Sequence, residues 1–184
     1  KDGKVIDTSM GFTPLDGVEM GTRCGSIDPA IVTFIMEHEG YTPAQMSDFM
    51  NKECGMLGVS GISSDSRDIE AAILKGEKHA TLAANILAYQ IKKYIGGYAA
   101  AMNGLDAVVF TAGMGENNPE LRERACKDME FLGIKLDNEL NAKMHHQPNM
   151  VKLSTDDSRV QVWLIPTNEE LVIASDTEKI VKSL

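Results

Sequence analysis

The sequence predicts an α/β domain, and three observations lead to that fold class. Two short apolar runs, LDAVVFTA (105–112) and RVQVWLI (159–165), have the length and composition of buried strands. Each run passes through a loop into a segment with helical character, which is the strand–loop–helix order of α/β proteins. Residues 77–102 add a third signal, because their apolar positions repeat with the period of one long helix.

Length and composition fit a single globular domain. The chain has 184 residues, enough to bury roughly 70% of its unfolded surface. Its net charge is −9 and no stretch is rich in Lys and Arg, so nucleic acid is not expected as a partner. No apolar stretch approaches the ~18 residues of a membrane span. Cys24, Cys54 and Cys126 are odd in number and far apart, which predicts reduced thiols and a cytoplasmic protein.

The N-terminal residues predict an irregular segment followed by a helix. KDGKVIDTSM contains neither an initiator Met nor an apolar signal core, so we expect the chain to be part of a larger protein. Residues 1–27 are punctuated by glycines and predict no regular element. Asp28 and Pro29 then predict a helix start, with Asp as the cap and Pro at the first helical position. This helix is expected to end at Gly40.

Three further helices are expected before the first strand. Thr42 and Pro43 predict a second helix start. The glycines and serines of GMLGVSGISSDSRD (55–68) predict a loop, and IEAAILKG (69–76) predicts a short helix. The long helix over 77–102 is expected to bury one face, made of residues three and four apart: Ala83, Leu87, Ile91, Tyr94 and Tyr98.

The two predicted strands are each followed by a candidate helix. The first strand runs directly into GMGEN (113–117), and Asn118-Pro119 then opens a helix expected over 119–133. The second strand ends at Pro166 and leads into a closing helix over 168–184. Both strands are continuous apolar runs, so both are expected to be buried on their two faces.

GMGEN is a candidate nucleotide-binding segment. Its place between a buried strand and a helix offers backbone N–H groups to an anion, and its glycines permit close approach. It has neither the Gly-Lys-Ser/Thr of a Walker loop nor the GxGxxG pattern. Glu116 would repel a phosphate, so contact with the nucleoside is an alternative. A tight strand-to-helix turn without a ligand is the other interpretation.

Two further loops carry arginines that suit anion binding. Arg23 lies between Gly21 and Gly25, and its planar fork could bind a carboxylate or phosphate, or cap a local group instead. In SSDSRD, Asp65 could accept a hydrogen bond from a ribose hydroxyl while Arg67 lies on an adenine face. The alternative for that segment is a helix cap followed by an exposed arginine.

PTNEEL (166–171) contains two glutamates with different expected roles. Thr167 as the cap and Glu170 three residues later form a capping box, which gives Glu170 a structural role. Glu169 then remains free at the carboxyl edge of the sheet, where ligands of α/β proteins bind. Mg²⁺ takes one or two carboxylates together with phosphate oxygens, so Glu169 is a candidate ligand. Favourable interaction of both glutamates with the helix dipole is the alternative.

Taken together, three strings resemble signatures of the acetate kinase family. They are DTSMGFTPLDGVEMGTRCGSIDP, FTAGMGEN and IPTNEELVIASDT, in the family's order and at similar separations. The resemblance covers essentially all 184 residues and implies the C-terminal domain of such an enzyme, with its N-terminal domain absent from this chain. It also implies a ribonuclease-H-like fold of the sugar kinase, Hsc70 and actin superfamily, with long helices.

The resemblance assigns site residues by matching position. Arg23 matches the arginine thought to stabilise the transition state, and Glu169 matches a magnesium-associated glutamate. Cys24 and Ser26 stand where Ser and Asp are more typical, a departure beside the key arginine. The segments implied to bind nucleotide comprise eight residues: Asp65, Ser66, Arg67, Gly113, Met114, Gly115, Glu116 and Asn117.

The implied reaction is phosphoryl transfer from ATP to acetate, giving ADP and acetyl phosphate with Mg²⁺ as cofactor. The resemblance implies a homodimer formed through this domain, to which the helix at 77–102 could contribute. A propionate or butyrate kinase is an alternative within the family. A different class of function is a nucleotide-binding dimerisation module without turnover, because half of the family's cleft is missing from the chain.

Overall fold

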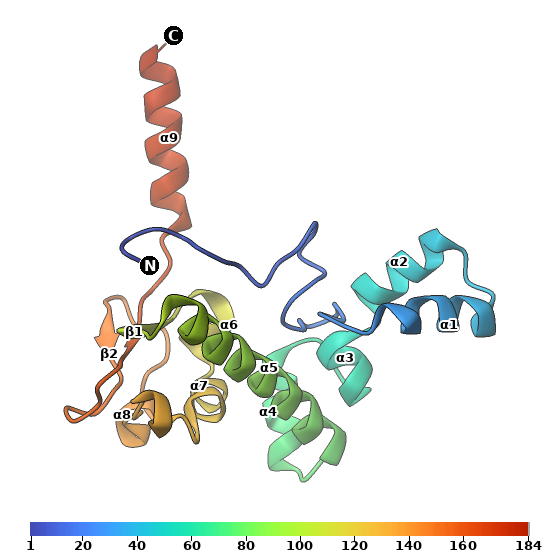
Figure 1. The fold of residues 1–184 in the computed structure, drawn as a ribbon, viewed down its shortest axis with the longest axis horizontal. Coiled ribbons are helices and arrows are strands. Elements are labelled where there is room, and N and C mark those ends of the chain that lie inside the picture. The colour runs from blue at the N-terminus through green and yellow to red at the C-terminus, as the bar shows by residue number, and fades with distance from the viewer. Residues whose placement is uncertain (184) are drawn as a thin grey trace. The chain divides into compact units, whose positions relative to one another are not determined.

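The computed structural model describes residues 1–183 and shows the α/β class expected from the sequence (Figure 1). It divides into two compact units. The first contains residues 1–105 and 124–127 and is helical; the second contains 106–123 and 128–183 and holds the sheet. No helix within 1–183 combines the length and hydropathy needed to cross a bilayer.

The first unit begins as predicted, with an irregular segment and two capped helices. Residues 1–28 contain no helix or strand. Helix α1 (Pro29–Glu39) is capped by Asp28, whose Oδ1 accepts from the N–H of Ala30 at 2.9 Å, and it ends at Gly40. Helix α2 (Pro43–Lys52) has a complete capping box between Thr42 and Gln45. Both starts are set by neighbouring residues, which explains why the sequence predicts them.

Helix α3 corrects the loop that the sequence predicts over 55–68. Residues Gly55–Ser60 are helical, and helix α4 (Ser66–Leu74) begins within the same stretch. The N–H groups of Met56 and Leu57, at the start of α3, donate to the carbonyls of Met20 and Gly21 at 2.9 Å. Met56 is also 2% exposed. Tertiary contacts therefore override the poor helix propensity of glycine in this segment.

Helix α5 (Lys78–Met102) is the long helix predicted at 77–102. Its N-terminal half is buried through small side chains and Leu87, against which α3 and α4 pack. The expected buried face is only partly right, since Ile91, Tyr94 and Tyr98 are half-buried. Alanines allow the shorter helices to approach α5 closely, while the tyrosines beyond them border more open surface.

A three-stranded sheet forms the core of the second unit. Strands β1 (Ala107–Phe110) and β3 (Gln161–Leu164) are parallel and in register, and β2 (Val151–Lys152) pairs antiparallel with β3. The two expected strands are confirmed, but not their burial on both faces. Val108 and Val162 are buried, whereas Val109 is 49% exposed. The period-2 alternation of strands therefore leaves one face open within the described residues.

Short helices connect the strands of the second unit. Helix α6 (Ala112–Asn117) and helix α7 (Pro119–Cys126) follow β1, then a 3₁₀ turn η1 (Glu130–Leu132) and helix α8 (Asn138–Ala142). The predicted helix at 119–133 is therefore too long. The chain adopts a left-handed conformation at Asp128, with φ 57°, and a helix cannot continue through it. Helix α8 and strand β2 were not expected, because elements of 5 and 2 residues are too short to show a periodic pattern.

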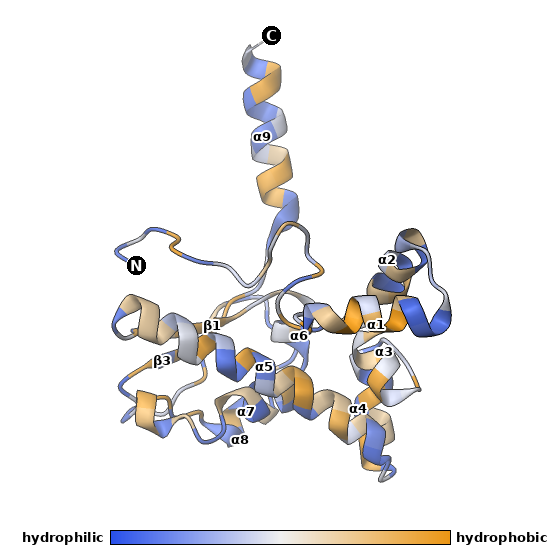
Figure 2. Ribbon diagram, turned by 45° about the vertical axis from the view of Figure 1, so that its right-hand side comes forward, coloured by the Kyte–Doolittle hydropathy of each residue, from blue (hydrophilic) through white to orange (hydrophobic). Residues whose placement is uncertain are grey.

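Helix α9 (Glu169–Ser183) confirms the closing helix; Leu184 of the expected 168–184 lies outside the described residues. None of its residues is buried. Leu171 and Ile180 are each about 60% exposed. Figure 2 shows hydrophobic residues on both α9 and α1, and α1 also has no buried residue.

Candidate functional site

The loop that carries Arg23 is fixed by backbone hydrogen bonds to the last turn of α2 and to the segment that joins α2 and α3. The N–H of Cys24 donates to Met50 O at 3.0 Å, and the N–H of Cys54 donates to Thr22 O at 3.0 Å. Within the loop, the N–H of Met20 donates to Arg23 O at 3.1 Å. The loop therefore presents Arg23 from a rigid platform although it contains no helix or strand.

Gly55, the first residue of α3, makes this platform possible. Its φ is +59°, a left-handed backbone conformation that residues other than glycine rarely adopt. A Cβ at this position would lie 2.1 Å from Met20 O and 2.7 Å from Arg23 O. The absence of a side chain therefore lets the start of α3 approach the arginine loop closely.

The Arg23 guanidinium borders a cavity of about 550 Å³. Its one polar contact within residues 1–183 is Nη1 to the sulfur of Met20 at 3.6 Å. Lys52 lines the same cavity, but its ammonium pairs with Asp48 at 2.8 Å. Arg23 is therefore a cation without a carboxylate partner among the described residues, as an anion-binding group requires.

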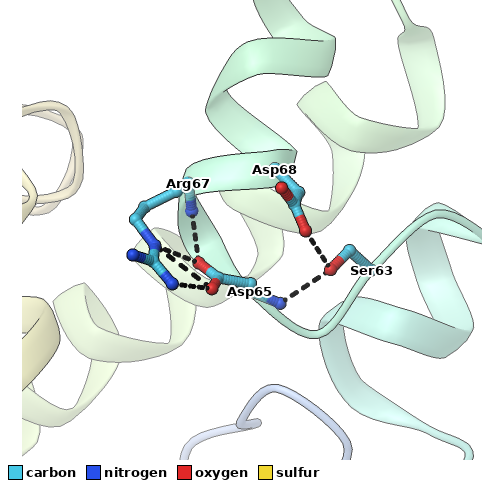
Figure 3. A network of polar contacts seen from close by, with 4 residues as sticks. All are labelled: Ser63, Asp65, Arg67 and Asp68. Atoms are coloured by element: carbon cyan, nitrogen blue, oxygen red, sulfur yellow. Dashed lines mark hydrogen bonds and ion pairs between the residues drawn. The ribbon is translucent and has the colours of Figure 1, made fainter.

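The segment containing Asp65, Ser66 and Arg67 forms a helix cap and an ion pair (Figure 3). Asp65 caps α4 by accepting from the N–H of Arg67 at 2.9 Å, and Ser66 is the first helical residue. The Arg67 Nε also donates to the Asp65 carboxylate, at 3.0 Å. These bonds from Arg67 lower the pKa of Asp65 to about 2. The geometry matches the capping interpretation, and nucleotide binding here stays a prediction.

The structure nevertheless brings this segment close to the arginine loop. Ser64 lines the cavity that Arg23 borders. A Cβ on Gly21 would lie 2.7 Å from Ser64 O. Two segments about 40 residues apart in the sequence therefore meet at one cavity of the first unit, which periodicity and propensity could not show.

In the second unit, GMGEN forms most of helix α6 and is not an extended loop. The helix begins directly after β1, and Ala112 at its start has φ 58°. Asn117 is held at both ends of its amide: Nδ2 donates to Gly113 O at 3.0 Å, and Oδ1 accepts from the N–H of His146 at 3.2 Å. A Cβ on Gly115 would meet the backbone of Phe110 at 3.3 Å, so this glycine permits close packing. Gly113 and Met114 complete the turn.

A buried arginine that the sequence did not indicate holds the end of α6. Arg122 on α7 is 0% exposed. Its Nη1 donates to the carbonyls of Gly115 at 2.7 Å and Glu116 at 3.0 Å, which lie at the C-terminal end of α6. Its other nitrogens donate to Asn141 Oδ1 and Met144 O. The sequence does not indicate that Arg122 is buried. Its neighbours in PELRERAC are mostly charged, which is the composition of a surface helix.

Glu116 and Thr167 link the segments that follow β1 and β3. Glu116 Oε1 accepts from the N–H of Thr167 at 2.8 Å and from its hydroxyl at 2.9 Å. These bonds from Thr167 lower the pKa of Glu116. Thr167 Oγ1 in turn accepts from the N–H of Ala112 at 3.0 Å. Glu116 and Thr167 therefore bind each other, and the Thr167 hydroxyl is engaged here and not at the helix start where the sequence placed it.

The capping box predicted for Thr167 and Glu170 is wrong by one residue. Helix α9 begins at Glu169, and Asn168 Oδ1 accepts from the N–H of Leu171 at 3.0 Å, so Asn168 is the cap. Thr167 cannot cap the helix because its hydroxyl is engaged with the α6 segment. Glu170 consequently has no capping role.

Glu169 is available as an oxygen ligand. It is exposed at the first helical position, and its carboxylate has no hydrogen-bond or ion-pair partner within residues 1–183. The described residues contain no group of three or more His, Cys, Asp or Glu side chains that could hold a metal. Glu169 therefore suits a magnesium ion that takes one protein carboxylate and draws its other ligands from nucleotide phosphates and water.

The predicted site residues fall into two groups. Arg23 and the segment 65–67 belong to the first unit, while 113–117 and Glu169 belong to the second. Each unit brings its own pair of segments together. The glycine Gly55, the buried Arg122 and the hydroxyl of Thr167 position these segments, and residue patterns alone identified none of the three for that role.

Comparison with known proteins places these features in one family. The chain matches the profile described as the Acetokinase family over residues 1–175. It is 58% identical over 185 residues to the acetate kinase of Thermoanaerobacter pseudethanolicus, an alignment that covers 100% of this chain and 45% of that protein. It is 56% identical over 182 residues to the acetate kinase of Bacteroides thetaiotaomicron, covering 99% and 45% respectively.

Solved structures confirm the fold. The Porphyromonas gingivalis acetate kinase superposes with a TM-score of 0.93 at 50% identity, covering 98% of this chain and 45% of that one. A propionate kinase from Francisella tularensis gives a TM-score of 0.86 at 38% identity, covering 95% and 44%. The expected ribonuclease-H-like α/β class is therefore confirmed, and the chain spans about half the length of the curated relatives it matches.

Proposed function

Because the chain belongs to the acetokinase family, we propose that it is the C-terminal domain of an acetate kinase, with the N-terminal domain outside this chain. The proposed reaction is ATP plus acetate giving ADP plus acetyl phosphate. The observation that carries the proposal is the Arg23 guanidinium, which borders a cavity on a rigid loop and has no carboxylate partner among residues 1–183.

The proposed chemistry depends on alignment and charge neutralisation. The acetate nucleophile is already ionised at pH 7, so no general base is required. Arg23 would donate its planar fork to the oxygens of the transferring phosphoryl group, whose negative charge is spread over those oxygens in the transition state. The fixed loop supports this role, because donors that are already oriented need no reorganisation during the reaction.

The remaining site residues are proposed to hold the nucleotide and its metal. The segments Asp65–Arg67 and 113–117 would bind the nucleotide, and the exposed carboxylate of Glu169 would anchor Mg²⁺. When bound, Mg²⁺ neutralises charge on the phosphate oxygens. Support for the first segment comes from Ser64, which lines the cavity beside Arg23. Support for Glu169 is its free carboxylate immediately after the β3 loop.

Acetate is proposed in preference to a longer acid because the matched curated relatives at 55–59% identity are named acetate kinases. The second candidate is propionate, which is favoured by the structural match to a propionate kinase.

We also propose a homodimer in the cytoplasm. Exposed apolar residues on α5, such as Leu82 and Tyr89, support an interface, and the thiols of Cys24 and Cys54 suit a reducing compartment.

The test is a comparison of acyl acceptors with the whole protein that contains this chain. Acyl phosphate is trapped as the hydroxamate after incubation with ATP, Mg²⁺ and either acetate, propionate or butyrate. The proposal expects the highest kcat/KM with acetate. A higher value with propionate would transfer the assignment to the second candidate, and no hydroxamate from any of the acids would overturn both.

A further inference from the structure

Thr167 is the centre of a closed set of hydrogen bonds between the two segments that follow β1 and β3. Its hydroxyl donates to Glu116 Oε1 at 2.9 Å and accepts from the N–H of Ala112 at 3.0 Å. The Thr111 hydroxyl lies 2.9 Å away and supplies the third bond. A hydroxyl has one donor and two acceptor sites, so all three are used.

From this arrangement we propose that Thr167 and Glu116 are positioning residues that hold Glu169 at a set place relative to residues 113–117. The inference rests on the proposed function, in which Glu169 anchors Mg²⁺ and 113–117 contact the nucleotide. Because the metal must bind the nucleotide's phosphates, these two segments have to be fixed relative to each other. Thr167 is two residues from Glu169 and bonds directly to both ends of α6.

The position of Glu169 depends on this connection because α9 provides little other anchorage. No residue of α9 is buried, so its own side chains do not fix its first turn within residues 1–183. Upstream, the N–H of Ile165 donates to Phe110 O at 3.0 Å and continues the β1–β3 pairing. Beyond Ile165, the bonds of Thr167 are the next connection of this segment to the rest of the unit. Asn168 then caps α9 directly.

Local backbone strain at Ala112 supports a positioning role. Its φ of 58° places a non-glycine residue in the left-handed region, which side-chain-bearing residues rarely adopt. Such conformations persist when surrounding contacts determine them, and the N–H of Ala112 donates to Thr167 Oγ1. Thr167 therefore contributes to holding the turn between β1 and α6.

The inference also accounts for a carboxylate in a segment proposed to bind nucleotide. A free Glu116 carboxylate near phosphate would be repulsive. In the structure, Glu116 Oε1 accepts two hydrogen bonds from Thr167, so this oxygen is engaged away from a bound nucleotide. Glu116 therefore acts through Thr167, while Gly113, Met114 and Asn117 remain the candidate contacts for the nucleotide.

The experiment measures magnesium-dependent nucleotide binding by the whole protein, using a fluorescent ADP analogue, for Thr167→Val and Thr167→Ser. Valine keeps the shape of threonine but removes all three bonds of the hydroxyl, whereas serine keeps them. Loss of a group that orients a metal ligand typically lowers metal affinity about 10–100-fold. We therefore expect Thr167→Val to raise the Mg²⁺ concentration for half-maximal binding at least tenfold, and Thr167→Ser to restore it to within about twofold.

A matched control separates positioning from general loss of stability. Ser158 has a similarly bonded hydroxyl in the same unit, with contacts to Lys135 N at 2.9 Å and Val160 O at 2.6 Å. It lies just before β3, away from the segments that follow the strands. Ser158→Ala should lower the thermal midpoint without changing the Mg²⁺ requirement. An equal shift in Ser158→Ala and Thr167→Val would overturn the positioning role.

A double-mutant cycle tests the bond between the two residues directly. Glu116→Gln, Thr167→Val and the double variant are compared by thermal midpoint and by Mg²⁺ requirement. If the residues act as one unit, the double variant resembles Thr167→Val; simple addition of the two effects contradicts the inference. Wild-type protein that binds no nucleotide would instead refute the proposed function, and the inference with it. Normal wild-type binding with unchanged variants would refute the inference alone.

Discussion

At the scale of single residues, Arg23 is the side chain on which the proposed chemistry depends most. Its position was suggested by neighbouring glycines and its role by family resemblance. The structure adds two facts: the loop is held by backbone bonds, and the guanidinium has no carboxylate partner within residues 1–183. An arginine with only a structural role would instead be expected to have local acceptors, as the buried Arg122 does.

We expect Arg23→Ala to reduce kcat of the whole enzyme by about 10²–10³ with little change in KM for ATP, because its bonds would form mainly in the transition state. Arg23→Lys should restore little activity, since one ammonium cannot reproduce the planar fork. Steady-state kinetics of both variants check this. A loss of kcat smaller than about tenfold in Arg23→Ala would place Arg23 in a structural role.

Glu19, four residues before Arg23, is a buried acid with a predictable effect on stability. It is 4% exposed, and its Oε1 has no hydrogen-bond partner. Burial raises the pKa of Glu19 from 4.5 to about 7. The folded protein therefore retains a proton at Glu19 between these pH values, where the unfolded chain has lost it.

The contribution of protonated Glu19 to stability is fully present below about pH 4.5 and is lost as pH rises through about 7. Glu19→Gln keeps the shape without the charge and should raise the thermal midpoint at pH 8 while changing it little at pH 4.5. The free-energy difference is on the order of 1–3 kcal/mol. Melts at the two pH values check this, with Glu39→Gln on the exposed α1 as the control for charge removal. An equal effect of Glu19→Gln at both pH values would contradict the assignment.

At the scale of secondary-structure elements, local signals predicted starts that depend on adjacent residues. Asp28-Pro29 and Thr42-Pro43 placed α1 and α2 correctly because each cap bonds within its own first turn. The cap of α9 was wrong by one residue because the Thr167 hydroxyl bonds to a segment about 50 residues earlier in the chain. No local rule includes such a competing partner.

The corrected cap of α9 changes what is expected of its neighbours. Asn168→Ala should lower stability by about 0.5–2 kcal/mol, the usual range for a lost cap, while Glu170→Ala should have little effect. Glu169→Ala should leave the thermal midpoint nearly unchanged but raise the Mg²⁺ concentration required for activity. Melts and Mg²⁺ titrations of the three variants check these outcomes. A destabilised Glu169→Ala with a normal Mg²⁺ requirement would exclude Glu169 as the anchor.

Helix α3 shows how one glycine can fix an element and a site together. The sequence predicted a loop because 55–68 is rich in glycine and serine. The helix forms because Gly55 allows the chain to touch the carbonyls of the Arg23 loop. That contact involves residues more than 30 positions apart, so it was outside the reach of periodicity and propensity.

Gly55→Ala and Gly61→Ala form a matched pair at the two ends of α3. Both glycines have φ near +60°, but a Cβ at Gly61 would meet nothing within 4 Å, whereas one at Gly55 would strike Met20 O. Gly61→Ala should destabilise by about 1 kcal/mol and leave kcat unchanged. Gly55→Ala should destabilise by more than about 2 kcal/mol and reduce kcat by displacing Arg23. Thermal melts and steady-state kinetics check this pair. Equal effects of the two substitutions would contradict the role of Gly55 in positioning Arg23.

At the scale of the whole molecule, each unit carries proposed site residues of its own. The first presents Arg23 and the segment 65–67, and the second presents 113–117 and Glu169. The α/β class, both longer strands and the long α5 were predictable from hydrophobic patterns. Hydrophobic patterns did not predict that these residues serve one function. That prediction came from the resemblance of three long motifs to one family. The chain covers about 45% of the length of its relatives, and we propose that the remaining groups of the cleft lie outside it.

The most direct test of this account is acetyl hydroxamate formation by the 184-residue chain alone and by the whole protein, under identical conditions. The whole protein should form acetyl phosphate from ATP and acetate. The chain alone should give no product above a no-protein control, because it supplies Arg23 and Glu169 without the other half of the cleft. Turnover by the isolated chain, or none by the whole protein, would contradict the assignment of this chain as one half of an acetate kinase.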